Sequence, residues 1–112
     1  MLDENKLFNG KGLFVFSDPG GAMPVLSFVE LRKDIFKKFK VISDRKYSFF
    51  SDYSFTIENL KSDPNEFLLT FKPDFIFTGT SYTSNIEIEF IKFSKQLNIK
   101  TYSYLDHSTL IK

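Results

Sequence analysis

The stretch FVFSDPGGAMPVLSFVEL, residues 14–31, joins a strand pattern to a helix pattern through a turn. The apolar run at residues 12–17 is short and lies between a glycine and Asp-Pro-Gly-Gly, which is typical of a strand buried on both faces of a parallel sheet. From Ala22 the apolar residues recur at helical spacing, and we expect this helix to end near residues 34–37, with Pro24 in its first turn. The stretch therefore predicts a strand-turn-helix unit whose turn is a candidate binding loop.

Strand and helix patterns alternate along the rest of the chain. Further strands are expected at residues 39–44, 53–58, 74–79 and 100–106, although residues 45–60 fit either a loose helix or a strand. A short helix is indicated by an N-cap, a first-turn proline, a capping-box acid and a terminating proline, which are Asp63, Pro64, Glu66 and Pro73. A later helix has Ser84 as its N-cap and Glu87 at the capping-box position, and its apolar face comprises Ile86, Phe90, Phe93 and Leu97.

This alternation predicts one α/β domain over residues 1–112, with a Rossmann-like, three-layer, doubly wound sheet. We expect about five strands, mostly parallel, in the order 3-2-1-4-5. In that order, the direction in which successive strands are added across the sheet reverses between the first and fourth strands. Ligands of open α/β sheets bind at the carboxyl ends of strands beside such a reversal, so the loops that follow strands one, four and five are the candidate site.

Composition narrows the classes of function. The formal net charge is +1 and 26% of residues are charged, so no nucleic-acid partner is expected. The chain has no cysteine and a single histidine, and we therefore expect no metal centre. Its opening residues lack a signal-peptide pattern and no apolar run approaches the length of a membrane span, which predicts a cytoplasmic protein without a transmembrane segment.

The loop after the first strand combines an acid with two adjacent glycines. Gly20 and Gly21 would let the backbone turn sharply and approach an anionic or polyhydroxylated ligand, whereas Asp18 could equally serve as a helix cap. The loop is not a G-x-G-x-x-G sequence and contains no phosphate-loop lysine, so we expect no dinucleotide cofactor and no other cofactor. Arg45, after the second strand, is a weaker candidate for contacting an anion and also fits a surface ion pair.

Two further loops carry polar residues at the same predicted edge. Gly79, Thr80 and Ser81 open a run, residues 79–84, that offers hydroxyls or backbone access beyond what helix capping needs, and these groups suit a sugar or a phosphate. Asp106 and His107 follow the last predicted strand. An imidazole near its ordinary pKa suits acid-base work on a hydroxyl, but a lone histidine is more often a structural hydrogen-bonding residue. The pair is the predicted catalytic set.

Together the segments FSDPGGA, FTGTSYTSNIE and YLDHST resemble the amino-terminal half of bacterial GT-B glycosyltransferase and UDP-N-acetylglucosamine 2-epimerase-like proteins. More narrowly, they are similar to surface-polysaccharide biosynthesis proteins with a D-P-G-G-A loop, a G-T-S loop and a D-H-x-x segment. The resemblance covers about residues 12–108. It implies an acceptor-side domain for capsular or other surface polysaccharide, with three loop groups, Asp18, Gly20 and Gly21, then Gly79, Thr80 and Ser81, then Asp106 and His107.

The resemblance also implies partners. A sugar or sugar-phosphate acceptor would bind this domain, while a second Rossmann-like domain or subunit would hold the nucleotide sugar, so we expect little catalysis from these 112 residues alone. A homodimer is a further expectation, since a cleft face rich in Tyr and Phe, left exposed without the second half, would be a candidate docking or self-association surface. One alternative stays open: a small regulatory α/β module that binds a phosphometabolite or nucleotide and acts through a partner. A flavodoxin-like or phosphoacceptor domain ranks below both.

Overall fold

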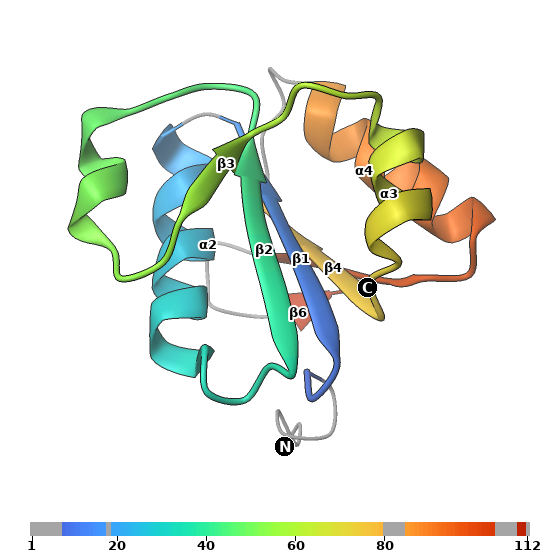
Figure 1. Cartoon of the computed structure of the whole chain (residues 1–112), viewed down its shortest axis with the longest axis horizontal. Coiled ribbons are helices and arrows are strands. Elements are labelled where there is room, and N and C mark those ends of the chain that lie inside the picture. Colours follow the sequence, from blue (N-terminus) through green and yellow to red (C-terminus); the bar gives the residue numbers. More distant parts are fainter. Residues whose placement is uncertain (1–7, 18, 80–84, 105–109, 112) are drawn as a thin grey trace.

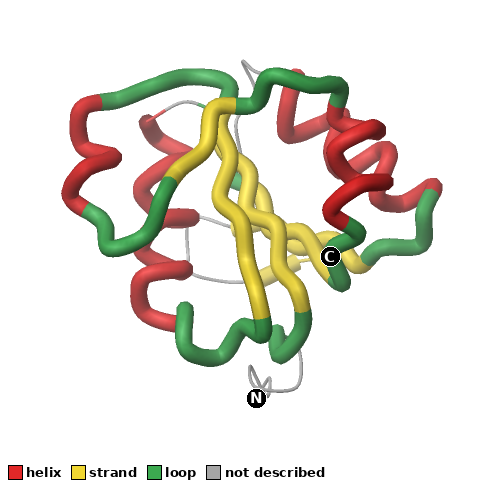
Figure 2. The backbone as a smooth tube through the Cα atoms, viewed as in Figure 1, coloured by secondary structure: helices red, strands yellow, loops and turns green. Residues whose placement is uncertain are grey.

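The computed structural model describes residues 8–17, 19–79, 85–104 and 110–111 of the 112-residue chain. Within these residues, one sheet contains the strands β1 (Lys11–Phe16), β2 (Lys38–Ser43), β3 (Ile57–Asn59), β4 (Phe75–Thr78), β5 (Lys100–Tyr104) and β6 (Leu110–Ile111). The helices are α2 (Pro19–Arg32), η1 (Ser48–Asp52, a 3-10 helix), α3 (Pro64–Phe71) and α4 (Asn85–Gln96). Figures 1 and 2 show them packed around the twisted sheet.

The sheet has the strand order β3-β2-β1-β4-β5-β6. Strands β1 to β5 run parallel to one another, which confirms the predicted parallel order 3-2-1-4-5. At the centre of the register, Val15 of β1 lies between Ile42 of β2 and Thr78 of β4. The short strand β6 was not predicted, and it pairs antiparallel with β5. The carboxyl ends of β1, β4 and β5 are therefore adjacent, as the site hypothesis requires.

Helices cover both faces of the sheet (Figure 1). On one face, α2 buries Val25, Leu26 and Val29 against the phenylalanines of β1 and β4. On the other face, the residues buried from α3 and α4 include Leu68 and Phe90, which pack against the aliphatic residues of β1, β2 and β4. This alternation follows from the two-residue period of a strand, which sends successive side chains to opposite faces. The doubly wound, three-layer arrangement is confirmed.

Phenylalanine dominates the α2 side of the core. The ring of Phe28 in α2 stacks on that of Phe77 in β4 with centroids 4.3 Å apart, and Phe8 meets both Phe28 and Phe75 edge-on. These large rings leave little room beside β1, where a Cβ atom added to Gly12 would lie 2.6 Å from Cζ of Phe75. Glycine at this position therefore allows the ring of β4 to approach the backbone of β1.

Helix α2 begins at Pro19, so the expectation of a start at Ala22 was wrong. Pro19 has a φ suited to the first helical position, and the helix forms as soon as the chain leaves β1. Gly20 and Gly21 are consequently helical rather than part of a sharp turn. Pro24 is the sixth residue of the helix, outside its first turn, and the residue four positions before it is Gly20. The expectation for Pro24 was also wrong.

The segment before β3 differs from the prediction. A strand was expected at residues 53–58, but β3 covers only Ile57–Asn59 and is preceded by the 3-10 helix η1. The aromatic residues of this segment do not alternate between two sheet faces. Instead Phe49, Phe50, Tyr53 and Phe55 pack against the α2-side core, and Tyr47 stacks on Phe49. We call residues 44–56 the hoop, because Figure 1 shows them leaving β2 and returning to β3 in a wide path beside α2.

Helices α3 and α4 largely follow their sequence signals. Asp63 caps α3, its carboxylate accepting a hydrogen bond of 3.2 Å from the Glu66 backbone N–H, and the helix ends at Phe71 before Pro73. Ser84, the predicted cap of α4, lies outside the described residues. On α4, Ile86 and Phe90 are buried and Phe93 is half-buried, as expected for the apolar face, but Leu97 follows the last helical residue and is exposed.

Candidate functional site

The predicted site residues divide into those the structure describes and those it does not. Asp18, Thr80, Ser81, Asp106 and His107 lie outside the described residues. The backbones of Gly20 and Gly21 form the first turn of α2, directly beyond the carboxyl end of β1. Gly79 is buried, and its N–H donates a hydrogen bond of 3.1 Å to the carbonyl of Val15. This bond holds the chain after β4 beside the end of β1.

Small hydroxyl side chains line the carboxyl ends of the three neighbouring strands. Thr78 ends β4 and Ser103 lies in β5, and their hydroxyl oxygens are 3.0 Å apart. Ser17 follows β1, is fully buried, and its hydroxyl has no hydrogen-bond partner among the residues that the structure describes. By two-residue alternation from Val15 and Ile76, the hydroxyls of Ser17 and Thr78 belong to the sheet face that α3 and α4 cover. We call Ser17, Thr78 and Ser103 the hydroxyl row.

A buried carboxyl group faces this same side of the sheet. Glu87 lies in the first turn of α4 and is only 2% exposed. Helix α4 begins at the carboxyl edge and packs against β1, β4 and β5, so the Glu87 side chain is enclosed in the layer that contains the hydroxyl row. The sequence predicted Glu87 only as a capping-box residue. Its position between Ile86 and Phe90 of the apolar face was the signal that it would be buried.

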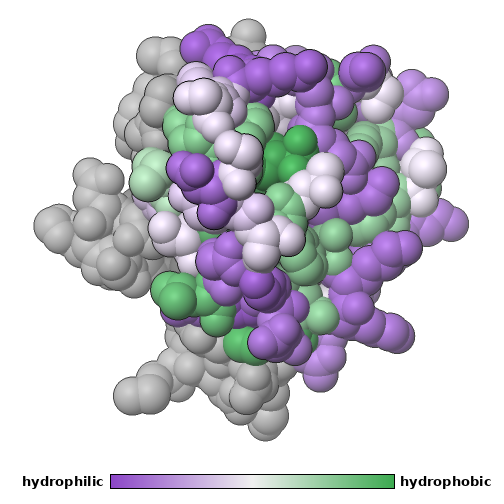
Figure 3. Space-filling view, turned by 60° about the vertical axis from the view of Figure 1, so that its left-hand side comes forward, coloured by the Kyte–Doolittle hydropathy of each residue, from purple (hydrophilic) through white to green (hydrophobic). Residues whose placement is uncertain are grey.

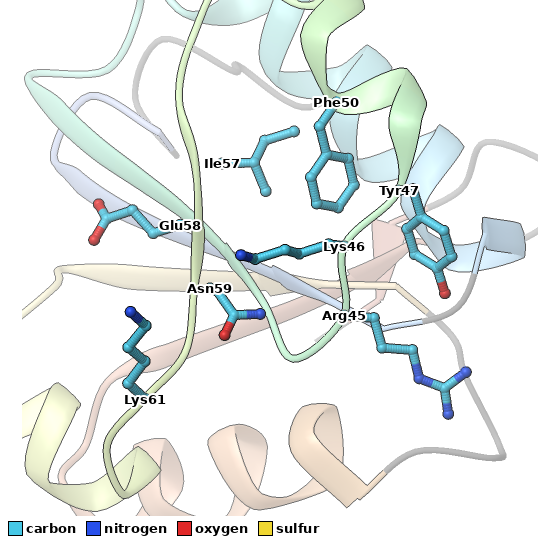
Figure 4. A pocket seen from close by; sticks show the side chains of 8 residues that line it. All are labelled: Arg45, Lys46, Tyr47, Phe50, Ile57, Glu58, Asn59 and Lys61. Carbon is cyan, nitrogen blue, oxygen red and sulfur yellow. The ribbon is translucent and has the colours of Figure 1, made fainter.

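A pocket opens at the other end of the same edge, between the hoop and β3. Its volume is about 550 Å³, and it is lined by Arg45, Lys46, Tyr47, Phe50, Ile57, Glu58, Asn59 and Lys61. Figure 4 shows these side chains around the space beside β3. Arg45, the weaker candidate from the sequence, therefore borders a hollow. Sequence reasoning missed the pocket itself, because it depends on the path of the hoop.

Hydrogen bonds fix both sides of this pocket to the carboxyl edge. The buried residue Ser43 ends β2, and its hydroxyl accepts a bond of 3.1 Å from the backbone N–H of Arg45. Its carbonyl accepts a bond of 2.8 Å from the backbone N–H of Leu60. From the hoop, the Tyr47 hydroxyl donates a bond of 2.9 Å to the carbonyl of Ser17. The pocket and the segment after β1 are thus joined by a direct contact.

Two other kinds of feature, a metal site and a membrane-spanning helix, are absent from the described part of the chain. Across those residues, no group of three His, Cys, Asp or Glu side chains could hold a metal ion, and no helix is long and apolar enough to cross a membrane. Comparison of the chain with family models, with curated proteins and with solved structures finds no match. The candidate site therefore rests on its own geometry: the hydroxyl row, the buried carboxyl of Glu87 and the adjoining pocket.

Proposed function

We propose that this chain binds a sugar or sugar-phosphate acceptor at the carboxyl edge of β1, β4 and β5, as the acceptor-side domain of a glycosyltransferase-like protein. The process would be the synthesis of a capsular or other surface polysaccharide in bacteria. The proposal draws on the resemblance of the three loop motifs and on the parallel order of the strands, which places the starts of those loops at one edge. In such a protein, a second Rossmann-like domain would supply the nucleotide sugar.

One observation carries the binding part of the proposal. The hydroxyl row and the buried carboxyl of Glu87 concentrate hydrogen-bonding groups at the carboxyl edge of an otherwise apolar core. Buried polar groups without partners lower stability, and the Ser17 hydroxyl is such a group within the described part of the chain. Sugar hydroxyls both donate and accept hydrogen bonds, so a polyhydroxylated ligand suits this edge. Asp106 and His107 remain the predicted catalytic residues of the complete enzyme.

Binding can be tested on the chain by itself. We expect titration with a panel of monosaccharides and sugar 1-phosphates to shift the backbone amide resonances of Gly79 and Ser103 in a two-dimensional nitrogen-15 spectrum. Thr78→Val removes one hydroxyl of the row at nearly constant shape, and it should weaken binding by about five- to thirtyfold, because a lost hydrogen bond in a shielded site is worth roughly 1–2 kcal/mol.

The matched control is Thr70→Val, which changes an exposed threonine of α3 and should leave affinity unchanged. Both variants must retain the wild-type spectrum away from the site. If no sugar of the panel shifts the amides at this edge, or if Thr70→Val weakens binding as much as Thr78→Val does, the proposed acceptor site is wrong.

A further inference from the structure

The pocket between the hoop and β3 differs in chemistry from the hydroxyl row. Three of its eight lining residues are cationic, Arg45, Lys46 and Lys61, and one is anionic, Glu58. On the side of the molecule that carries the hoop, hydrophobic surface occurs in separate patches bordered by hydrophilic side chains (Figure 3). The hollow is therefore a place where positive charge meets a concave, partly apolar surface, which is the usual form of a small-molecule site.

The single carboxylate of the lining is already directed elsewhere. Glu58 alternates with Ile57 and Asn59 along β3, and it leaves the strand on the side opposite to the one that Lys46 approaches (Figure 4). Its carboxylate oxygen lies 3.8 Å from Nζ of Lys40, a residue of β2 outside the pocket. The Glu58 carboxylate is thus directed toward Lys40 and away from Lys46.

Among the described residues, the three cations of the pocket have no carboxylate partners. Within the part of the chain that the structure describes, Arg45, Lys46 and Lys61 form no ion pair. A contrasting case lies at the opposite end of the strands, in a hollow of about 230 Å³ that Lys11 and Lys40 help to line. There Lys11 donates to the carbonyl of Phe71 at 2.8 Å, and Lys40 pairs with Glu58. Lys38 also lines that hollow and forms no ion pair among the described residues, so the contrast with the cations beside β3 holds for Lys11 and Lys40 only.

The pocket also has a neutral hydrogen-bond donor and two apolar side chains that pack against the core. The Asn59 amide lies near the Lys46 side chain in Figure 4, and its nitrogen donates a long hydrogen bond of 3.5 Å to the carbonyl of Ser43, which leaves its second N–H available. Phe50 and Ile57 are half-buried and pack against the core beneath. The Tyr47 hydroxyl proton is already donated to Ser17, so this group can only accept.

From these contacts we infer that the pocket between the hoop and β3 binds a phosphoryl group of a small phosphorylated molecule. A phosphoryl group has several strong acceptor oxygens and suits the ammonium of Lys46 and the amide of Asn59, which lie on the same side of β3 in Figure 4, with Arg45 and Lys61 at the border of the hollow. Nucleic acid is a poorer occupant, because the formal net charge of the chain is only +1 and the cations border a hollow instead of a stripe. The inference does not depend on sugar binding at the hydroxyl row.

The test measures binding of inorganic phosphate and of pyrophosphate by nitrogen-15 amide shifts and by calorimetry, at constant ionic strength. We expect shifts at Tyr47 and Asn59. In the variant Arg45→Gln/Lys46→Gln/Lys61→Gln, affinity should fall by at least about tenfold, since several charge-assisted bonds are lost. The matched control, Lys92→Gln/Lys95→Gln/Lys100→Gln, removes the same charge from exposed lysines elsewhere and should change affinity by less than about threefold.

Several outcomes would overturn this inference. Equal losses in the two triple variants would show that net charge alone attracts phosphate, and amide shifts confined to Gly79 and Ser103 would place the anion at the hydroxyl row. Tighter binding of a single-stranded oligonucleotide than of pyrophosphate would indicate that the ligand is a nucleic acid and not a small molecule. Phosphate binding at the pocket without any sugar response at Gly79 would support this inference while contradicting the proposed function, so the two can fail separately.

Discussion

At the scale of single residues, Gly12 shows how tightly the α2-side core is packed. Its replacement by alanine would force the new Cβ against the rings of Phe75 and Phe14, at 2.6 Å and 3.0 Å. Both rings are fully buried or nearly so and have no space to retreat. We expect Gly12→Ala to lower the free energy of unfolding by about 1–3 kcal/mol, the usual effect of overpacking a core, as measured by urea denaturation.

A double-mutant cycle separates this clash from a general effect on β1. In the background Phe75→Leu the ring that meets the added Cβ is gone, so Gly12→Ala should be less harmful there than in the wild type. An alanine effect of equal size in both backgrounds would show that contact with Phe75 is not its cause.

At the scale of elements, an ionic cluster ties the end of α2 to the hoop. The Glu30 carboxylate accepts hydrogen bonds from Nζ of Lys33 and from both the backbone N–H and the hydroxyl of Ser54, the latter two at 2.9–3.1 Å. The hydrogen bonds from Lys33 and Ser54 lower the pKa of Glu30 from 4.5 to about 2. Residues far apart in the sequence are thus joined at the surface.

The cluster predicts a dependence of stability on pH. A carboxyl group whose pKa is lower in the folded state stabilises the protein above its ordinary pKa, and this contribution is lost as the pH falls toward the folded value. The free energy of unfolding of the wild type should therefore exceed that of Glu30→Gln above about pH 4.5, and the difference should disappear as the pH falls toward 2. Urea denaturation at a series of pH values measures this, and a difference that stays constant over the range would contradict it.

The elements also show which parts of the fold the sequence can predict. Strand β1 and helix α3 were located well because their signals are local: a short apolar run, and a cap at Asp63 followed by Pro64. The region of β3 was not, because its aromatic residues pack on a distant helix, which no local period reveals. The same dependence on tertiary packing limited the prediction of the candidate site. The predicted strand order located the carboxyl edge of the sheet, whereas the burial of Glu87 and the hydrogen bond from Tyr47 to Ser17 depend on tertiary packing.

At the scale of the whole molecule, one sheet supports two separate core clusters. Leu26 belongs to the cluster on the α2 side and Leu68 to the cluster on the α3 and α4 side, and both are buried. Since the strands between them are shared, loss of either cluster removes support from the other. The two halves of the core should therefore unfold together.

We expect Leu26→Ala and Leu68→Ala each to lower the free energy of unfolding by about 2–5 kcal/mol, with a single transition in each case. Circular dichroism and tyrosine fluorescence should report the same midpoint. Leu69→Ala, at an exposed position beside Leu68, is the control and should have little effect. Transitions that differ between the two probes in one variant would show that the clusters unfold independently.

The outermost strands of the sheet are its shortest. Strand β3 has three residues and β6 has two, and β6 runs against its neighbour. An edge this brief offers few free amide and carbonyl groups for a strand of another molecule to join. Growth of the sheet from chain to chain, the first step of many amyloid-like assemblies, is therefore disfavoured at the described edges.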